Sequence, residues 1–280
     1  MKIWRFLDLD KIDGFYSAAI FESIGRYVGA SSSPETILFW RVKSPVVYLG
    51  YHQCVVDEIN AGFCSQNGIG IVRRVLGGGC GFCDKNQILY SVIGREGGVI
   101  PNDIQAAYAK VLSGVMNALE TLGFEGELEP AHNAVLVPIV PVFKYGVSYG
   151  VTRSRKISGN AQGRFGGAVL INGSLLLDFD FELMDKVLKN PTKNLRPVAH
   201  AKEGMITLKE MGIADIDAVK NALRQGFENA LGIRSKAGVL SKSEAKMAEQ
   251  LMDKYTQKDW TYRMDIKRTL RQKRTADERR

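Results

Sequence analysis

Two amphipathic helical segments, separated by strand-like segments, constrain the fold of this chain most strongly. Residues 103–122 place apolar side chains at helical spacing on one face, with Asp103 able to cap the start and Gly123 able to end the helix. Residues 215–231 repeat this pattern and end at Gly232. Because several strand-like segments lie before and between these helices, the sequence predicts an α+β domain rather than a regular βαβ array.

The strand-like segments are rich in β-branched and aromatic residues, as strands are. Some of them are joined by short turns, and an amphipathic segment over residues 13–28 precedes them. This order predicts a central mixed β-sheet flanked by helices. The expected strands cover residues 37–43, 46–50, 69–75, 87–93, 134–151 and 167–178.

The chain changes character after Gly232, where a polar helical segment leads into a basic tail. We therefore expect a main domain over residues 1–235 and a helical extension with a basic tail over residues 236–280. Much of the net charge of +8 lies in this tail, because residues 263–280 contain eight basic and three acidic side chains. A basic tail is usually a solvated end, so nucleic acid is not an expected partner.

The composition is that of a globular protein, with 45% hydrophobic and 24% charged residues. No apolar run approaches the roughly 20 residues of a membrane span. The first residues are acidic where a signal peptide would need an apolar stretch. Four cysteines in 280 residues do not make a disulfide framework. We therefore expect a cytoplasmic protein that does not enter a membrane and keeps its thiols reduced.

Residues 73–84, RRVLGGGCGFCD, carry the first chemical signal. Two arginines leave a predicted strand and run into three glycines, which allow a backbone to approach a ligand closely and point its N–H groups at an anion. Arginine at the rim can hold a phosphate or carboxylate through two hydrogen bonds. The segment contains no P-loop or dinucleotide signature. The alternative is a flexible hairpin with two surface arginines.

Residues 153–162, RSRKISGNAQ, carry the second signal. Lys156 stands between a basic turn and a Ser-Gly-Asn sequence that can form a tight bend. A lysine held in this way can neutralise phosphate charge while an α-phosphate is attacked. The alternative is a basic hairpin tip that faces water.

Together, the two segments resemble the signatures of one family, the lipoate–protein ligases. Residues 73–84 are similar to the family's RRxxGGGxVxHD, and RKISGNAQ is similar to its KxSGSA. Over about residues 3–262, further similarity follows the family's order. The segments that carry it are WRFLDLDKIDGFYSAAIFESI, YLGYHQCVVDEIN, HNAVL, NGSLLLDFD and YTQKDW.

The resemblance implies a catalytic domain with the fold of biotin and lipoate ligases, and a two-step reaction. The lipoate carboxylate attacks the α-phosphate of Mg-ATP, which gives lipoyl-adenylate and pyrophosphate. A lysine of an acceptor protein, either a lipoyl domain or the glycine-cleavage H-protein, then attacks the adenylate and releases AMP. Fixed cations and N–H donors suit this anionic chemistry.

Carried over position by position, the resemblance assigns Lys156 to catalysis, in contact with both the lipoyl carbonyl and the α-phosphate. An apolar tunnel for the acyl chain could be lined by Tyr51, Val75, Leu76 and Phe82. The implied contacts are ATP with Arg74, Gly79, Cys80, Gly81, Phe82, Asn133 and Lys156; lipoate with Arg73, Val75, Gly77, Gly78 and Lys156; and Mg²⁺ with Asn133.

Three departures from the family pattern affect this interpretation. Cys83 replaces the family's His after the glycines, and Ala134 replaces the Asp that follows Asn133, which weakens the inferred metal site. Fuller members also carry a further domain after the Tyr…Trp element, whereas a short basic tail follows it here. We therefore expect full activation to require a separate accessory protein.

The nearest alternative is an octanoyl or lipoyl transferase of the same fold, which also carries a KxxGSAQ-like segment matched by Gln162. These transferases use a cysteine nucleophile between the Asn segment and the Lys motif, and need no ATP. The sequence has no cysteine between Asn133 and Lys156. Because covalent catalysis through an enzyme-bound thioester needs a thiolate at the carbonyl, this absence favours the ligase.

More distant alternatives have weaker support. Residues 146–150 match the Gly-x-Ser-x-Gly elbow of hydrolases around Ser148, but a strand-like basic segment follows instead of a helix. A non-catalytic lipoyl- or nucleotide-binding module remains open because of Cys83 and Ala134. His132 and His200 are interpreted as structural or surface residues. A zinc site is a further alternative, with candidate ligands His52, Cys54, Cys64, Cys80 and Cys83.

Overall fold

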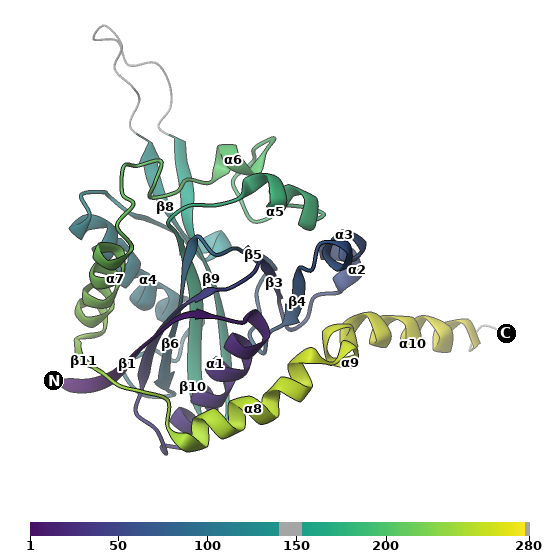
Figure 1. Cartoon of the computed structure of the whole chain (residues 1–280), viewed down its shortest axis with the longest axis horizontal. Helices are drawn as coiled ribbons and strands as arrows, with labels where there is room; N and C mark the ends of the chain where they lie inside the picture. The colour runs from purple at the N-terminus through teal and green to yellow at the C-terminus, as the bar shows by residue number, and fades with distance from the viewer. Residues whose placement is uncertain (140–152, 278–280) are drawn as a thin grey trace, which may run out of the picture.

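The computed structural model describes residues 1–139 and 153–277, and its largest element is an eight-stranded mixed sheet (Figure 1). The strand order is β11-β1-β2-β6-β10-β9-β8-β7, with β1 parallel to both β2 and β11 and the pairs from β2 to β7 antiparallel. This arrangement confirms the predicted mixed sheet. Its strands are β1 (Lys2–Ile12), β2 (Thr36–Val42), β6 (Gln87–Arg95), β7 (Glu127–Glu129), β8 (Ala134–Ile139), β9 (Arg153–Phe165), β10 (Ala168–Leu176) and β11 (Ile233–Ala237).

A second, three-stranded sheet carries the glycine-rich segment. Its order is β4-β3-β5, from Gly70–Arg73, Val46–Leu49 and Gly81–Cys83. Strand β3 lies in the centre, parallel to β4 and antiparallel to β5. The segment that joins β4 to β5 is therefore a crossing loop over β3, which excludes the simple hairpin that the sequence left open.

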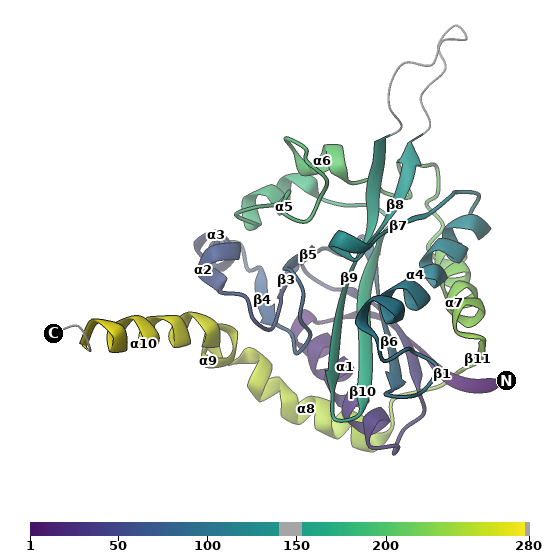
Figure 2. The same ribbon diagram turned by 180° about the vertical axis from the view of Figure 1, so that it is seen from behind.

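Helices cover both faces of the large sheet, as Figures 1 and 2 show from opposite sides. Helices α4 (Ile104–Thr121) and α7 (Ile216–Leu231) pack on one face, and α1 (Gly14–Gly29) and α8 (Lys242–Thr256) on the other. Strand alternation supplies both cores. In β2, for example, Phe39 faces α7 while Leu38 and Trp40 face α1.

Local capping signals set the ends of the main helices. The Asp103 carboxylate accepts a hydrogen bond from the backbone N–H of Ala106, which confirms the predicted start of α4. Gly232 ends α7 in the left-handed conformation, as the sequence indicated. The remaining helices are α2 (Val55–Glu58), α3 (Ala61–Gln66), the 3-10 helix η1 (Pro130–His132), α5 (Phe181–Val187), α6 (Ala201–Gly204), α9 (Lys258–Thr261) and α10 (Arg263–Asp277).

The C-terminal helices are joined to the body of the protein by buried polar contacts. Glu244 in α8 receives two hydrogen bonds from Arg5 in β1, at 2.6 and 2.7 Å. Glu22 in α1 accepts a hydrogen bond from Tyr255. The boundary expected near residue 235 falls within β11, which pairs with β1. Helix α10 then extends away from the body beside α2 (Figure 1).

Two sequence-based expectations differ from the structure. The Ser-Gly-Asn bend expected after Lys156 is wrong, because residues 153–165 form the continuous strand β9, hydrogen-bonded to β8 and β10. The strand expected over residues 134–151 is seen as β8 up to Ile139, and the rest of that range lies outside the described residues. Within residues 1–139 and 153–277, no helix combines the length and apolar character that crossing a membrane requires.

Candidate functional site

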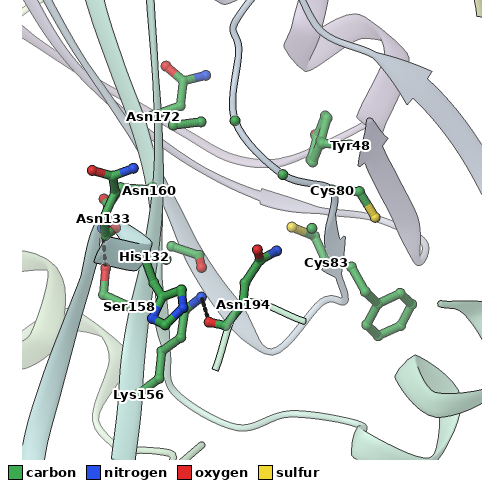
Figure 3. Close-up of a pocket in the computed structure, with 18 of the residues that line it drawn as sticks. Tyr48, Cys80, Cys83, His132, Asn133, Lys156, Ser158, Asn160, Asn172 and Asn194 are labelled. Carbon is green, nitrogen blue, oxygen red and sulfur yellow. Dashed lines mark hydrogen bonds between the residues drawn. The ribbon is translucent and has the colours of Figure 1, made fainter. Parts of the chain in front are cut away.

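A cavity of about 370 Å³ lies between the two sheets, where the end of η1, β9 and β10 face β3, β5 and the glycine loop, residues 77–79 (Figure 3). The segment after α5 forms a further wall through residues 188–195. The two segments singled out in the sequence therefore meet across one cavity, although they are far apart along the chain. A concave space of this kind, lined by both polar and apolar side chains, is typical of a small-molecule site.

Lys156 projects from β9 into the polar side of the cavity (Figure 3). Its Nζ lies 3.5 Å from the carbonyl oxygen of Asn194. Removal of the ammonium from water lowers its pKa to about 8, since burial disfavours the charged form. Gly159 makes room for this side chain, because a Cβ there would lie 3.0 Å from Lys156 Cε. Lys156 can therefore be either a cation or a neutral amine in the cavity near physiological pH.

A connected polar network lies beside Lys156. The hydroxyl of Tyr90 in β6 donates to Asn160 Oδ1 at 2.5 Å, and Asn160 Nδ2 donates to the carbonyl oxygen of Asn133 at 3.0 Å. Asn133 has a φ of 48° and is one of the few non-glycine residues in the left-handed region. Its side-chain Oδ1 is buried and has no hydrogen-bond partner in the described part of the chain.

The opposite end of the cavity is apolar. Phe21 from α1, Trp40 from β2, Tyr48 from β3 and Leu89 from β6 line it, together with Cys83. The Tyr48 hydroxyl turns away to contact the Ser17 hydroxyl at 2.5 Å. This lining suits an aliphatic acyl chain whose reactive carbonyl points toward Lys156.

Arg74 lines the cavity but holds the glycine loop rather than presenting an open guanidinium. Its Nη1 donates to the carbonyl of Tyr48 at 2.8 Å, and its Nη2 to those of Gly77 and Gly79 at 2.8 and 2.6 Å. Burial lowers the pKa of this guanidinium from its ordinary value. Arg74 therefore stabilises the conformation of the glycine loop by donating hydrogen bonds to the loop's backbone carbonyls.

Arg73 lies outside the cavity and is fully buried. Its guanidinium donates to the carbonyl oxygens of Gly50, Tyr51, Gln53, Trp260 and Thr261. Adjacent side chains on a strand point to opposite faces, so only one of the two arginines can face the cavity.

The structure brings most of the sequence-predicted site residues together. Arg73, Val75 and Gly77 do not line the cavity, and neither do the tunnel candidates Leu76 and Tyr51. The remaining predicted residues do line it, namely Arg74, Gly78, Gly79, Cys80, Gly81, Phe82, Asn133 and Lys156.

Other cavity residues were missed in the sequence. His132, interpreted there as structural, lines the cavity directly before Asn133, whereas His200 is exposed at the start of α6. Asn160 and Asn172 also line it. Each of the three stands inside a segment that carried the family resemblance: His132 in HNAVL, Asn160 in RKISGNAQ and Asn172 in NGSLLLDFD.

Two of the four thiols lie on the cavity wall, Cys80 and Cys83. Burial raises the pKa of Cys80 to about 12 and raises the pKa of Cys83 further. Neither thiol is therefore disposed to ionise.

No group of three His, Cys, Asp or Glu side chains suitable for a metal occurs in the described ranges, which leaves the zinc alternative without ligands there. The segment around Ser148 lies outside the described residues.

Solved structures with the same fold have lipoate-ligase activities in their names. A bi-partite lipoate protein ligase from Thermoplasma acidophilum, studied with its E2 lipoyl domain, superimposes with a TM-score of 0.79 and 25% identity, covering 94% of this chain and 98% of that chain. A lipoate-protein ligase A bound with ATP superimposes with a TM-score of 0.75 and 26% identity, covering 94% of this chain and 100% of that chain.

Sequence relatives carry a different activity in their names. Octanoyltransferase LipM of Kyrpidia tusciae is 30% identical, and the match covers 94% of this chain and 100% of that relative. The same enzyme of Halalkalibacterium halodurans is 28% identical with equal coverage. A model of the lipoyl protein ligase A/B catalytic domain matches residues 13–228. The chain therefore belongs to the lipoyl protein ligase A/B catalytic domain family.

Proposed function

We propose that this chain transfers an octanoyl or lipoyl group from a thioester donor to a lysine of an acceptor protein, without ATP. The acceptor would be a lipoyl domain or the glycine-cleavage H-protein. The octanoyltransferase names of its relatives and the lipoyl domain named with a structural neighbour support this reaction class. The cavity supports it independently, because an apolar end for the acyl chain faces a lysine of lowered pKa.

One observation carries the choice of a donor other than ATP: Arg74 is already bonded to three backbone carbonyls. A triphosphate needs several cations aimed at its oxygens. Within the described ranges, the other cations that line the cavity are Lys156 and Lys193, and Lys193 is paired with Glu58 at 2.6 Å. The positive charge available to a nucleotide is therefore small in this arrangement.

The donor set also fits Mg²⁺ poorly. Magnesium in nucleotide sites is usually held by one or two carboxylates together with phosphates and water. Among the described residues that line the cavity, Glu58 is the one carboxylate, and its partner is Lys193. Asn133 offers a single amide oxygen, and Ala134 replaces the neighbouring carboxylate of the family pattern. The metal role expected for Asn133 therefore has little chemical support.

A thioester is already activated, so transfer requires positioning and charge stabilisation rather than a nucleotide. The acceptor amine attacks the carbonyl carbon, a C–N bond forms, the C–S bond breaks, and the donor leaves as a thiol. In its charged form Lys156 stabilises the oxyanion that develops on the carbonyl oxygen. In its neutral form, which its lowered pKa makes accessible, it can take the proton that the attacking amine loses.

The ATP-dependent lipoate ligase remains the second candidate because of one sequence observation. No cysteine occurs between Asn133 and Lys156, where the related transferases place their nucleophile. This candidate predicts pyrophosphate release that depends on both lipoate and ATP, through a lipoyl-adenylate. The accessory protein expected from the sequence belongs to this candidate and is included in its test.

The two candidates separate when the acyl donor is varied. Purified protein is incubated with a lipoyl domain and either octanoyl-carrier protein alone, or octanoate or lipoate with Mg-ATP, with and without a candidate accessory protein. We expect acylation of the lipoyl domain with the carrier-bound donor and no pyrophosphate release. If acylation requires ATP in every combination, the transferase function is wrong and the ligase function is supported. Lys156→Ala should lose this acylation, and Lys202→Ala, altered at an exposed position on α6, serves as its matched control.

A further inference from the structure

Tyr90, Gly173 and Asn160 form one row across three neighbouring strands. Gly173 in β10 pairs with Tyr90 of β6 on one side and with Asn160 of β9 on the other. The hydrogen bond from the Tyr90 hydroxyl to Asn160 Oδ1 passes over this glycine. A Cβ at Gly173 would lie 2.1 Å from Asn160 Oδ1 and 2.4 Å from the Tyr90 hydroxyl. The glycine therefore keeps open the space in which the two side chains meet.

This row fixes the orientation of the Asn160 amide. Because Oδ1 accepts from Tyr90, the Nδ2 group must point the other way, where it donates to the carbonyl of Asn133 at 3.0 Å and to Ser158 Oγ at 3.3 Å. Asn160 stands where the KxSGSA signature has a serine, whose shorter side chain carries a single hydroxyl group. The asparagine thus joins a buried tyrosine to the backbone of Asn133.

Asn133 is held in a conformation that L-residues adopt rarely, with φ 48°. A hydrogen bond on its carbonyl stabilises that conformation. The consequence lies in its side chain, which lines the cavity and whose Oδ1 is buried without a partner in the described structure (Figure 3). A buried acceptor without a donor is costly, so this atom is suited to receive a donor from a ligand.

The surroundings of Asn133 indicate the kind of donor. No carboxylate accompanies its amide oxygen, since Ala134 follows it and Glu58 is paired with Lys193. A lone amide oxygen is a weak site for a divalent cation but a good acceptor for an N–H group. Lys156 and Asn133 line the same cavity, so an N–H donor held at Asn133 would lie on the polar side that also holds the catalytic lysine.

We propose that Asn160 is a positioning residue that holds Asn133 so that its Oδ1 receives an N–H of the attacking ε-amine of the acceptor lysine. This inference rests on the proposed acyl transfer to lysine, and it applies whichever donor supplies the acyl group. The Oδ1 contact directs the amine at the carbonyl carbon, and Lys156 takes the proton released on attack. Tyr90 and Gly173 contribute indirectly: Tyr90 orients the Asn160 amide through its hydrogen bond, and Gly173 leaves the space for that contact.

The test uses variants of the full chain with octanoyl-carrier protein as donor and a lipoyl domain as acceptor. We expect Asn133→Ala and Asn160→Ser to lower kcat/KM for the acceptor by about tenfold, the loss of one hydrogen bond to an amine that gains positive charge as it attacks. The Kd for the octanoyl-carrier donor should stay within twofold of wild type. Asn133→Asp, which keeps an acceptor oxygen and tolerates a positive φ, should recover most of the loss.

Asn229→Ser, at an exposed position on α7, is the control, and thermal unfolding checks that each variant is folded. An equal loss in donor affinity and in acceptor kcat/KM would indicate a collapsed cavity and overturn the inference. Acceptor kcat/KM that is unchanged in either Asn133→Ala or Asn160→Ser would overturn it as well. A wild-type protein that acylates no acceptor with any donor would instead refute the proposed function itself.

Discussion

Arg73 and Trp260 hold each other through reciprocal hydrogen bonds, although 187 residues separate them in sequence. Arg73 Nε donates to the carbonyl of Trp260 at 3.1 Å, and Trp260 Nε1 donates to the carbonyl of Arg73 at 2.8 Å. The strand that leads into the glycine loop is thus fastened to the C-terminal helices. These two hydrogen bonds therefore join the end of β4, which leads into the glycine loop, to helix α9.

Loss of this connection should reduce stability. Trp260→Phe removes the indole donor and leaves the buried Arg73 carbonyl without it, so the free energy of unfolding should fall by about 1–2 kcal/mol. Arg73→Ala leaves several buried carbonyls without a donor and should cost about 3 kcal/mol or more. Denaturant unfolding measures both, with Lys258→Ala in α9 as an exposed control. A Trp260→Phe protein as stable as wild type would show that the contact contributes nothing.

The pH dependence of acyl transfer should show the protonation state of Lys156. Its pKa of about 8 means that the neutral amine predominates only above that pH. The acceptor lysine titrates near its ordinary value, higher on the scale. We therefore expect the logarithm of kcat/KM to rise steeply up to about pH 8 and less steeply above it. A profile without a change of slope near pH 8, or with the same change in the residual activity of Lys156→Ala, would contradict the assigned role.

Stability should show the cost of keeping Lys156 in the cavity. The pKa is lowered in the folded protein from the ordinary 10.5, so between about pH 8 and 10.5 the unfolded chain binds more protons and stability rises with pH. Below pH 8 both states are protonated and the full cost of burying the charge is present. Lys156→Met should therefore be more stable than wild type by about 1–2 kcal/mol at pH 7. The difference should shrink as pH rises through this window; a less stable Met variant would refute the argument.

The cavity thiols should not carry the acyl group. Burial disfavours the thiolate of both Cys80 and Cys83, and a thiolate is the form that attacks a thioester. We expect Cys80→Ser and Cys83→Ala each to keep kcat within about threefold of wild type. Intact-mass measurement after acid quench should find no acyl adduct on the enzyme. A trapped thioester on either cysteine would instead establish a covalent intermediate.

The sequence predicted those parts of the fold whose signals are local. Helix α4 and its Asp103 cap follow from side chains within a few residues of one another, and the mixed sheet follows from the order of its segments. The Ser-Gly-Asn bend was predicted wrongly because Ser158 and Gly159 pair with β8 on one side and with β10 on the other, which holds them extended. Pairing partners distant in sequence overrode a local turn preference.

The site was predicted in part for the same reason. The resemblance placed Lys156, Asn133 and the glycine loop in one site, and the structure brings them to one cavity. It could not indicate where Arg73 and Arg74 point, because the carbonyls that bind them come from β3, the glycine loop and the C-terminal helices. The role of a long polar side chain depends on acceptors that only the folded chain supplies.

The most direct test of the central claim is the intact mass of a lipoyl domain after incubation with this protein and octanoyl-carrier protein in nucleotide-free buffer with a chelator. We expect a mass gain of one octanoyl group on the lipoyl domain with wild type and none with Lys156→Ala. No mass gain with wild type without nucleotide, together with a gain once Mg-ATP and free octanoate or lipoate are supplied, would contradict it.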